Sequence, residues 1–313
     1  SLWRHTVGVS DEDMAEQIRR DGIDILVDLS GHTIGNRLAV FVHKPAPVQI
    51  TAWGHAEGTG IPTIDAFLAD SVVVPESERS FFAETVIDLP CFLPYAPPGY
   101  AADVAALPAL SAGVFTFGCF NRLDKFSEDA LALWARVLAA VPGSQLLLKD
   151  SQLGGAENQR RVAATFATHG ISGDRLAFLG ASPHPEHLAT FARVDVALDP
   201  FPQNGGTSTF EALWHGVPVV TLRGRTPAGR AGDAINSALG LNEFAARTQD
   251  EYVAIAARAA ADLPRLAALR AGLRHRMTSS PLGNSAAYTR AVEVIYRDLW
   301  RGWCDGPRRR STK

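Results

Sequence analysis

The stretch VALDPFPQNGGTSTFEALWHGVPVVTL, residues 196–222, decides the fold class. An apolar run is followed by a loop with two glycines, a helical pattern and a second apolar run, which is typical of a parallel α/β sheet. Gly205 and Gly206 let the backbone approach a ligand closely, and Thr207 and Ser208 supply hydroxyls beside a helix N-terminus. The loop therefore suits a pyrophosphate, although a glycine turn with a Ser or Thr N-cap is the commoner explanation of a lone motif.

The alternation of apolar runs and helical patterns continues on both sides of this stretch. Strands are predicted to end at Phe120, Leu179 and Leu198, and helices are predicted over 127–142 and 157–169. This order predicts a doubly wound parallel sheet, in which ligands lie at the carboxyl ends of the strands. The loops after Phe120, Leu179 and Leu198 are therefore the candidate ligand-binding loops.

The first part of the chain is predicted to form another α/β lobe. A helix is expected over 11–22, followed by a buried parallel strand that includes Ile23 and Leu29. Further strands are expected over 48–53, 66–74 and 84–90.

Residues 91–112 are rich in Pro and Ala and lack a sustained period, which is typical of a linker. Two amphipathic helices are predicted near the C-terminus, over 261–277 and 287–300. We therefore predict an N-terminal lobe with its linker over 1–105 and a C-terminal nucleotide-binding lobe, with the C-terminal helices, over 106–313.

Composition and charge exclude several classes of protein. The 313 residues are 46% hydrophobic with a formal net charge of -3, so we expect neither a nucleic-acid partner nor a membrane partner. Three widely spaced cysteines indicate neither a disulfide framework nor a zinc site, which favours a cytoplasmic protein. The basic run Arg308, Arg309 and Arg310 is expected to be a solvated end.

A second polar loop, GCFNRLDKF, contains Asn121, Arg122 and Lys125 ahead of a helix. An enzyme whose leaving group is a diphosphate must stabilise the charge that grows on the departing phosphate, with a metal or with fixed cations and helix N-termini. Lys125 and Arg122 could supply this charge, and no DxD-like pair lies in a suitable loop. We therefore predict that no metal is needed, while surface cations without a partner remain the alternative.

A third loop, GASPHPEHLATF, contains Ser182, His184 and His187. A metal site would need further ligands nearby, so stacking on a base or hydrogen bonding to it is favoured over metal binding. A structural histidine near a helix start is the alternative. Glu211, on the first turn of the helix after the glycine loop, either complements the helix dipole or accepts hydrogen bonds from ribose.

Five segments, taken together and in order, resemble the protein O-GlcNAc transferase family. They are DILVDLSGHTIGNR, KPAPVQITAWGHAEGTG, FGCFNRLDKFSEDALALWARVLAAVP, DPFPQNGGTSTFEALWHGVPVVT and SSPLGNSAAYTRAVEVIYRDLW. The resemblance implies a GT-B fold, with two Rossmann-like lobes facing a cleft and the first lobe incomplete. It also implies inverting, metal-independent transfer of GlcNAc from UDP-GlcNAc to Ser or Thr hydroxyls of proteins, with no cofactor.

The resemblance also assigns roles around the diphosphate of the donor. Lys125 would contact the diphosphate and is the predicted catalytic residue, while Arg122 stands where the family usually has Gln. Thr207 and Ser208 match the diphosphate-binding pair, and Gly206 stands in place of a His.

Other positions would hold the nucleoside and the sugar. Ser182 and His187 match positions that hold the uracil, His184 replaces a Lys, and Glu211 replaces an Asp that binds ribose. The remaining predicted donor-site residues are Gly54 and His55, in a loop that lines the sugar, and Asn121, Asn204 and Gly205. His55 could also act as an acid or base, or simply pack or face solvent.

The family's active-site His and Asp and its tetratricopeptide repeats would lie upstream of Ser1. The chain begins without Met, so an upstream part that contains these partner segments could be missing. The alternatives are a UDP-sugar-binding module without turnover, a transferase that uses GDP-fucose or UDP-glucose, and an epimerase on the same fold.

Overall fold

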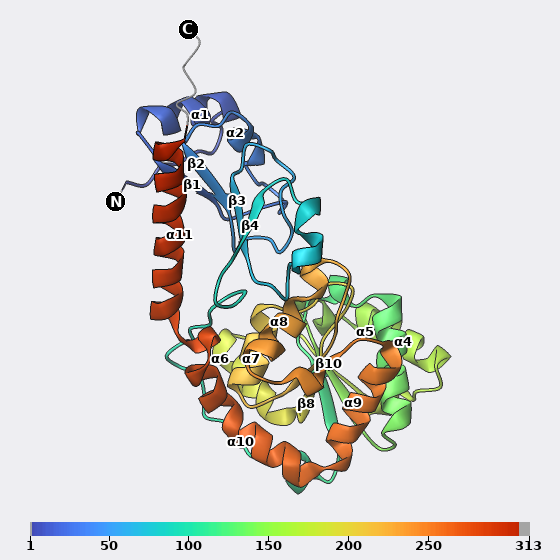
Figure 1. The fold of residues 1–313 in the computed structure, drawn as a ribbon. Helices are drawn as coiled ribbons and strands as arrows, with labels where there is room; N and C mark the ends of the chain where they lie inside the picture. The colour runs from blue at the N-terminus through green and yellow to red at the C-terminus, as the bar shows by residue number, and fades with distance from the viewer. Residues whose placement is uncertain (1, 307–313) are drawn as a thin grey trace. The chain divides into compact units, whose positions relative to one another are not determined.

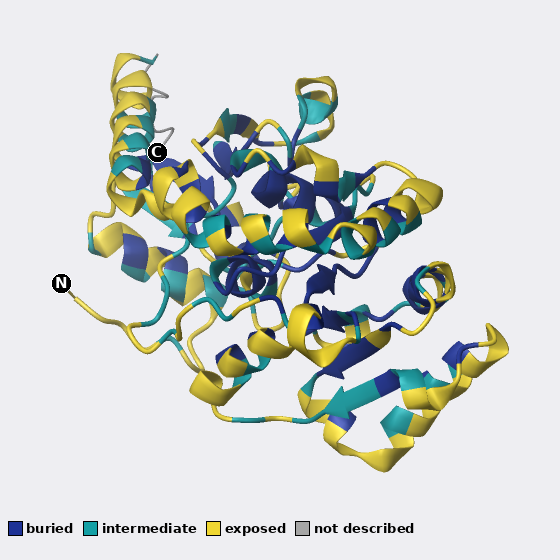
Figure 2. Ribbon diagram, turned by 90° about the horizontal axis from the view of Figure 1, so that it is seen from below, coloured by how far each residue is buried: buried dark blue, intermediate teal, exposed yellow. Residues whose placement is uncertain are grey.

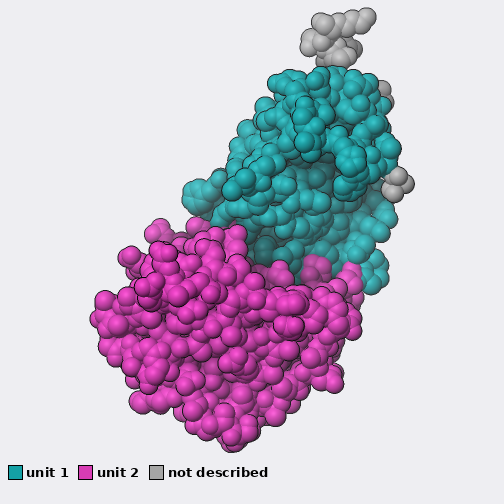
Figure 3. Space-filling model, turned by 180° about the vertical axis from the view of Figure 1, so that it is seen from behind, with its two compact units in different colours: residues 1–93, 286–313 teal, residues 94–285 magenta. Residues whose placement is uncertain are grey.

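The computed structural model describes residues 2–306, so the basic run Arg308, Arg309 and Arg310 lies outside the described residues. The chain forms two units, which Figure 3 colours separately. The first unit contains residues 1–93 and 286–313, and the second contains residues 94–285. Each unit is described by itself.

The first unit is built on a four-stranded sheet in the order β1-β2-β3-β4, and all of its pairs are parallel. The strands are β1 (Ile25–Asp28), β2 (Val48–Thr51), β3 (Ala66–Ala69) and β4 (Thr85–Asp88). The helices are α1 (Asp11–Arg20), α2 (Leu38–Val42) and α11 (Ser285–Asp305) (Figure 1). Ser10 caps α1 by accepting a hydrogen bond from the Asp13 amide.

The prediction that the first strand is buried is wrong at both ends. Ile23 is 37% exposed and Leu29 is 60% exposed, and the strand itself covers only Ile25–Asp28. β1 lies at the edge of the sheet and pairs, among the described residues, with β2 alone. Ile23 and Leu29 lie before and after β1, outside the sheet, so the packing that covers the strand does not bury them.

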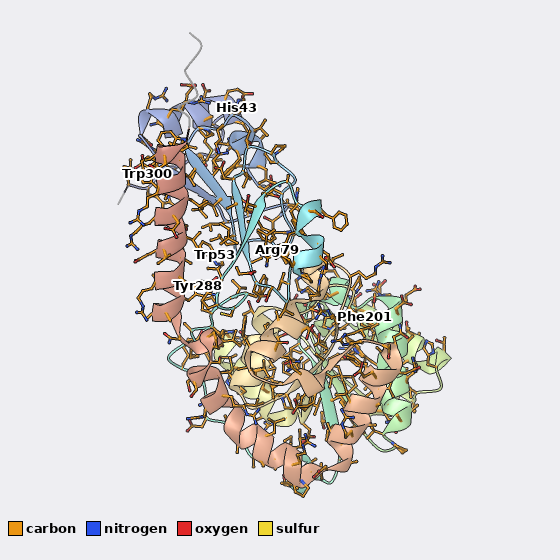
Figure 4. The ribbon with its side chains drawn as sticks, viewed as in Figure 1. His43, Trp53, Arg79, Phe201, Tyr288 and Trp300 are labelled. Carbon is orange, nitrogen blue, oxygen red and sulfur yellow. The ribbon has the colours of Figure 1, made fainter. Side chains whose placement is uncertain are left out.

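Helix α11 is grouped with the first unit, whereas the sequence assigned it to the second lobe. Trp53, in the loop after β2, donates from Nε1 to the Tyr288 hydroxyl at 2.6 Å, and Figure 4 shows the two side chains near each other. The Tyr288 hydroxyl also donates to the Phe92 carbonyl at 3.5 Å. These contacts hold α11 against residues far away in the sequence.

The second unit is built on a six-stranded parallel sheet in the order β10-β9-β8-β5-β6-β7. The strands are β5 (Thr116–Cys119), β6 (Gln145–Lys149), β7 (Leu176–Leu179), β8 (Val196–Leu198), β9 (Val219–Leu222) and β10 (Ala245–Ala246). The chain starts at β5, adds β6 and β7 on one side, and then adds β8 to β10 on the other. The strand order therefore reverses between β5 and β8, where ligands bind in such sheets.

Helices cover this sheet, and Figure 2 shows buried strands beneath helices with exposed outer faces. They are α3 (Ala109–Ala112), α4 (Glu128–Ala140), α5 (Ala156–Thr168), α6 (His184–Ala189), α7 (Thr207–Trp214), α8 (Ala231–Ala238), α9 (Gln249–Ala261) and α10 (Leu263–Ser279). α4 packs against both α5 and α9, and its Trp134 is fully buried. No helix within residues 2–306 combines the length and apolar character that crossing a bilayer requires.

Candidate functional site

The loops after β5 and β8 meet at the point where the strand order reverses. Lys125, which ends a short 3-10 helix, donates from Nζ to the Asn204 carbonyl at 2.7 Å. Ser208 donates from its hydroxyl to Asn121 Oδ1 at 2.9 Å. Four predicted site residues from distant parts of the sequence therefore lie together at the carboxyl ends of neighbouring strands.

The N-terminus of α7 points its unsatisfied amides toward this junction. Gly206 is the N-cap, and no side chain among residues 2–306 makes a capping hydrogen bond there. Thr207 is exposed and Ser208 is half-buried. A helix N-terminus with uncapped amides carries partial positive charge and favours an anion, so the geometry suits a phosphate group.

Lys125 is the cation at this junction. Its side chain is half-buried, and burial lowers the pKa of its ammonium group, while the charge of Asp199 opposes that shift. One ammonium proton is donated to Asn204, and an ammonium has three protons to donate. Lys125 can therefore hold the loop and contact a ligand at the same time.

Asp199, at the end of β8, belongs to the site although the sequence analysis did not select it. Its carboxylate accepts from the Gly205 amide at 2.7 Å and from the Thr221 hydroxyl at 2.8 Å. Burial raises the pKa of Asp199 to about 7, although both hydrogen bonds and the charge of Lys125 lower it. A polar residue that ends an apolar strand run just before a glycine loop was the available signal.

Asn204 was predicted to bind the donor, but the protein itself engages its polar groups. Its backbone amide donates to the Ala228 carbonyl at 3.1 Å, and its side-chain Nδ2 donates to the Pro200 carbonyl at 3.0 Å. Its Oδ1 accepts from the Gly232 amide at 3.3 Å, and its side chain is buried. Asn204 therefore joins its own loop to the segment 228–232 rather than presenting a free side chain.

His184, His187 and Glu211 come together beside the glycine loop. His184 Nε2 lies 2.9 Å from Glu211 Oε1, and His187 Nε2 lies 3.5 Å from Glu211 Oε2. The two imidazole rings stack, with centroids 6.0 Å apart and planes at 13°. His187 also packs edge-on against Phe120, which begins the loop after β5. His184, His187 and Glu211, three of the residues predicted to hold the nucleoside, thus form one cluster beside the glycine loop.

Burial is the largest single influence on Glu211 and would raise the pKa of its carboxyl. Hydrogen bonds from His187 and His184 outweigh burial, so the pKa of Glu211 lies below its usual value. The group is therefore an ionised acceptor at neutral pH, and both of its oxygens already face histidines.

Ser182 is held by a lysine that the sequence analysis did not select. Lys149, at the end of β6, donates to the Gly180 carbonyl at 2.8 Å and to the Ser182 hydroxyl oxygen at 2.9 Å. An ammonium only donates, so Ser182 keeps its own proton for another acceptor. Arg122, in contrast, is exposed and lies 3.3 Å from Asp124.

Gly54 and His55 belong to the first unit and lie after β2. A Cβ atom at Gly54 would lie 1.8 Å from the Leu29 carbonyl oxygen, so the close approach of two loops requires glycine there. His55 packs edge-on against His32 with ring centroids 5.9 Å apart. Gly54 thus has a structural role of its own, and its predicted role in lining the sugar stays a prediction.

No group of three or more His, Cys, Asp or Glu side chains within residues 2–306 is placed to hold a metal ion. Metal independence remains a prediction. The three cysteines are free thiols, with Cys91 and Cys119 buried and Cys304 exposed.

The sequence profile of glycosyl transferase family 41 matches residues 7–93 and 106–292. The chain belongs to this family. This membership confirms the predicted resemblance to O-GlcNAc transferases.

Among the family's solved structures, a mutant of the Thermobaculum terrenum O-GlcNAc transferase is 38% identical to this chain. The TM-score is 0.90, and the match covers 96% of this chain and 57% of that chain. Anabaena HepE in complex with UDP and glucose is 14% identical, with a TM-score of 0.60 over 92% of this chain and 81% of that chain, which shows the fold alone. The GT-B prediction is confirmed by these neighbours.

Among curated relatives, a protein of Solanum lycopersicum described as a probable UDP-N-acetylglucosamine--peptide N-acetylglucosaminyltransferase, SPINDLY, is 38% identical over 307 residues. That match covers 97% of this chain and 33% of the relative. The similarly described Arabidopsis thaliana SEC is 30% identical, over 95% of this chain and 31% of the relative. The chain therefore spans about a third of the length of these relatives.

Proposed function

We propose that this chain is the donor-binding part of a glycosyltransferase that moves GlcNAc from UDP-GlcNAc to Ser or Thr hydroxyls of proteins. The transfer inverts the anomeric centre and needs no metal. The observation that carries the proposal is the junction of Lys125 with the N-terminus of α7, where the strand order reverses. Membership of family 41 and the descriptions of its relatives support the donor and the acceptor.

The proposed reaction is a displacement at the anomeric carbon. The acceptor oxygen forms a bond to this carbon, and the bond from the carbon to the phosphate oxygen breaks with its electron pair leaving on UDP. The acceptor's proton passes to a base. Lys125 and the amides of α7 stabilise the charge that grows on the leaving diphosphate, which is the role a metal has in other transferases.

The cluster of Ser182, His184, His187 and Glu211 is proposed to bind the nucleoside. It lies beside the diphosphate loop because α6 packs its histidines against Glu211, one turn into α7. Ser182 offers a hydroxyl proton to a carbonyl of the base, since Lys149 already donates to its oxygen.

Calorimetric titration with UDP, UDP-GlcNAc and GDP-fucose tests this proposal. We expect selective binding of the uridine nucleotides, and about two- to tenfold weaker binding by Thr207→Ala, the equivalent of one hydrogen bond. Arg136→Ala is the matched control, because Arg136 is an exposed cation of the second unit that is paired with Asp250. Preference for GDP-fucose would reject the proposed donor, and the absence of nucleotide binding would reject the proposed function.

A further inference from the structure

The segment 94–105 was predicted to be part of a linker, but it is packed onto the second unit on both sides of Tyr100. The Tyr95 amide donates to the Leu282 carbonyl at 2.7 Å, and the Tyr95 ring stacks on Phe210 of α7 with centroids 5.4 Å apart. At the other end, the buried Arg270 donates from Nε to the Ala105 carbonyl at 2.7 Å. Tyr100 is therefore held at a defined place between two anchors.

The Tyr100 hydroxyl reaches the histidine cluster. It lies 2.8 Å from Nδ1 of His184, and the two rings pack edge-on with centroids 5.8 Å apart. The other ring nitrogen of His184, Nε2, lies 2.9 Å from Glu211 Oε1. Both ring nitrogens are thus engaged, by residues from two different chain segments.

The directions of these hydrogen bonds follow from chemistry. A carboxylate only accepts, so Nε2 of His184 carries a proton and donates to Glu211. In the neutral imidazole Nδ1 is then an acceptor, and the Tyr100 hydroxyl is the donor that it faces. The chain from Tyr100 through His184 to Glu211 therefore fixes the orientation of the His184 ring, which is 45% exposed.

We propose that Tyr100 and Glu211 are positioning residues that hold His184 by both ring nitrogens, so that the stacked His184 and His187 rings are pre-arranged for the nucleoside of the donor. Tyr100 affects nucleoside binding by orienting His184, and it does not affect binding of the diphosphate. This inference rests on the proposed function. It adds Tyr100 to the donor site and gives Glu211 the role of holding both histidines.

The chain offers a matched pair of variants. Tyr100→Phe removes the hydroxyl that faces His184 and keeps the ring. Tyr95→Phe removes a hydroxyl in the same segment that is buried without a hydrogen-bond partner among the described residues, and it keeps the stack on Phe210.

The first measurement separates the nucleoside end from the diphosphate end. We expect Tyr100→Phe to weaken UDP binding about fivefold, the equivalent of one hydrogen bond. Competition by inorganic pyrophosphate should be unchanged, and in transfer assays KM for the donor should rise while kcat stays the same. An equal loss for UDP and pyrophosphate, no loss for UDP, or the same loss in Tyr95→Phe would overturn the inference.

The second measurement needs no nucleotide. Nitrogen-15 NMR of the histidine side chains should show that Nδ1 of His184 loses its hydrogen-bond donor in Tyr100→Phe and keeps it in Tyr95→Phe. An unchanged Nδ1 signal in Tyr100→Phe would show that the contact does not exist. A shifted signal in Tyr100→Phe together with no UDP binding by the wild-type chain would separate the two proposals. Tyr100 would then hold His184, but the proposed function and the role of the cluster in nucleoside binding would be rejected.

Discussion

In each of the two sheets, a buried aspartate lies at the carboxyl end of one strand. It accepts hydrogen bonds from a loop amide and from a threonine of the neighbouring strand. In the first unit, Asp28 accepts from the Gly31 amide at 2.9 Å and from the Thr51 hydroxyl at 2.8 Å. In the second unit, Asp199 accepts from the Gly205 amide at 2.7 Å, and Thr221 is its threonine partner. The same device thus closes two different loops.

The difference lies in the loop that each aspartate holds. Asp28 reaches an amide three residues ahead, which makes a local turn. Asp199 reaches an amide six residues ahead, so the residues between them form a wide loop that leads into the N-terminus of α7 beside Lys125. The local turn uses the Gly31 amide within the turn, whereas the wide loop leads into the uncapped N-terminus of α7, beside the Lys125 cation of the β5 loop. The predictions below test this contrast.

The largest expected effect comes from removing Lys125, the cation that the loop after β5 places beside the Asp199 loop. Lys125→Ala should lower kcat for GlcNAc transfer by about a hundred- to a thousandfold, because one charge-stabilising donor is lost in the transition state. The dissociation constant of UDP should change far less. Transfer rates of the full protein and calorimetry measure the two effects, with Arg136→Ala as control. A fall in affinity as large as the fall in kcat would show that Lys125 contributes equally to ground-state binding.

Two glycines separate packing from ligand binding: Gly54, which packs against the Asp28 turn at Leu29, and Gly206, which ends the Asp199 loop. Gly54→Ala places a Cβ against the Leu29 carbonyl and should lower the free energy of unfolding by about 3 kcal/mol, the upper end for overpacking. Gly206→Ala meets no atom within 4 Å and should cost less than about 1 kcal/mol, yet weaken UDP binding. Denaturant unfolding and calorimetry measure both. If Gly206→Ala were the more destabilising variant, or if it left UDP affinity unchanged, the contrast between the loops would not hold.

The last expected effect, which is spread over a wide pH range, is the pH dependence of stability at Asp199. Its pKa is about 7 in the folded chain against an ordinary value of 3.8, so the folded state binds the proton more tightly. The stability that this proton contributes is present below about pH 4 and is lost as the pH rises to about 7. Asp199→Asn should therefore flatten the fall in the free energy of unfolding between pH 5 and pH 8. Parallel pH profiles for the wild type and the variant would contradict this expectation.

Much of the fold could be predicted from local patterns in the sequence. The strands β5 to β9 and the helices α4, α5 and α7 occur where apolar runs and helical patterns indicated them. The helices α8 and α9 were missed, because alanine-rich and polar segments such as 249–261 give a weak periodic signal. The exposure of Ile23 and Leu29 was missed because the apolar run extends beyond Ile25–Asp28, the residues that form the strand.

The candidate site was predicted unevenly for the same kind of reason. Lys125 and Thr207 follow strands and precede helices, so their positions at the edge of the sheet could be inferred. Tyr100 and Lys149 could not, because nothing in their local sequence shows that the tertiary fold brings them to His184 and Ser182.

The sequence by itself determined the family, the parallel sheets and the loops that meet at their carboxyl ends, because these depend on local periodicity and on ordered motifs. Only the tertiary structure decided which groups remain available to a ligand. It showed that the side chain of Asn204 is engaged within the protein, that Glu211 faces two histidines and that α11 belongs with the first unit. The physical reason is that hydrogen-bond partners and burial depend on contacts between segments far apart in the chain, which no local pattern records.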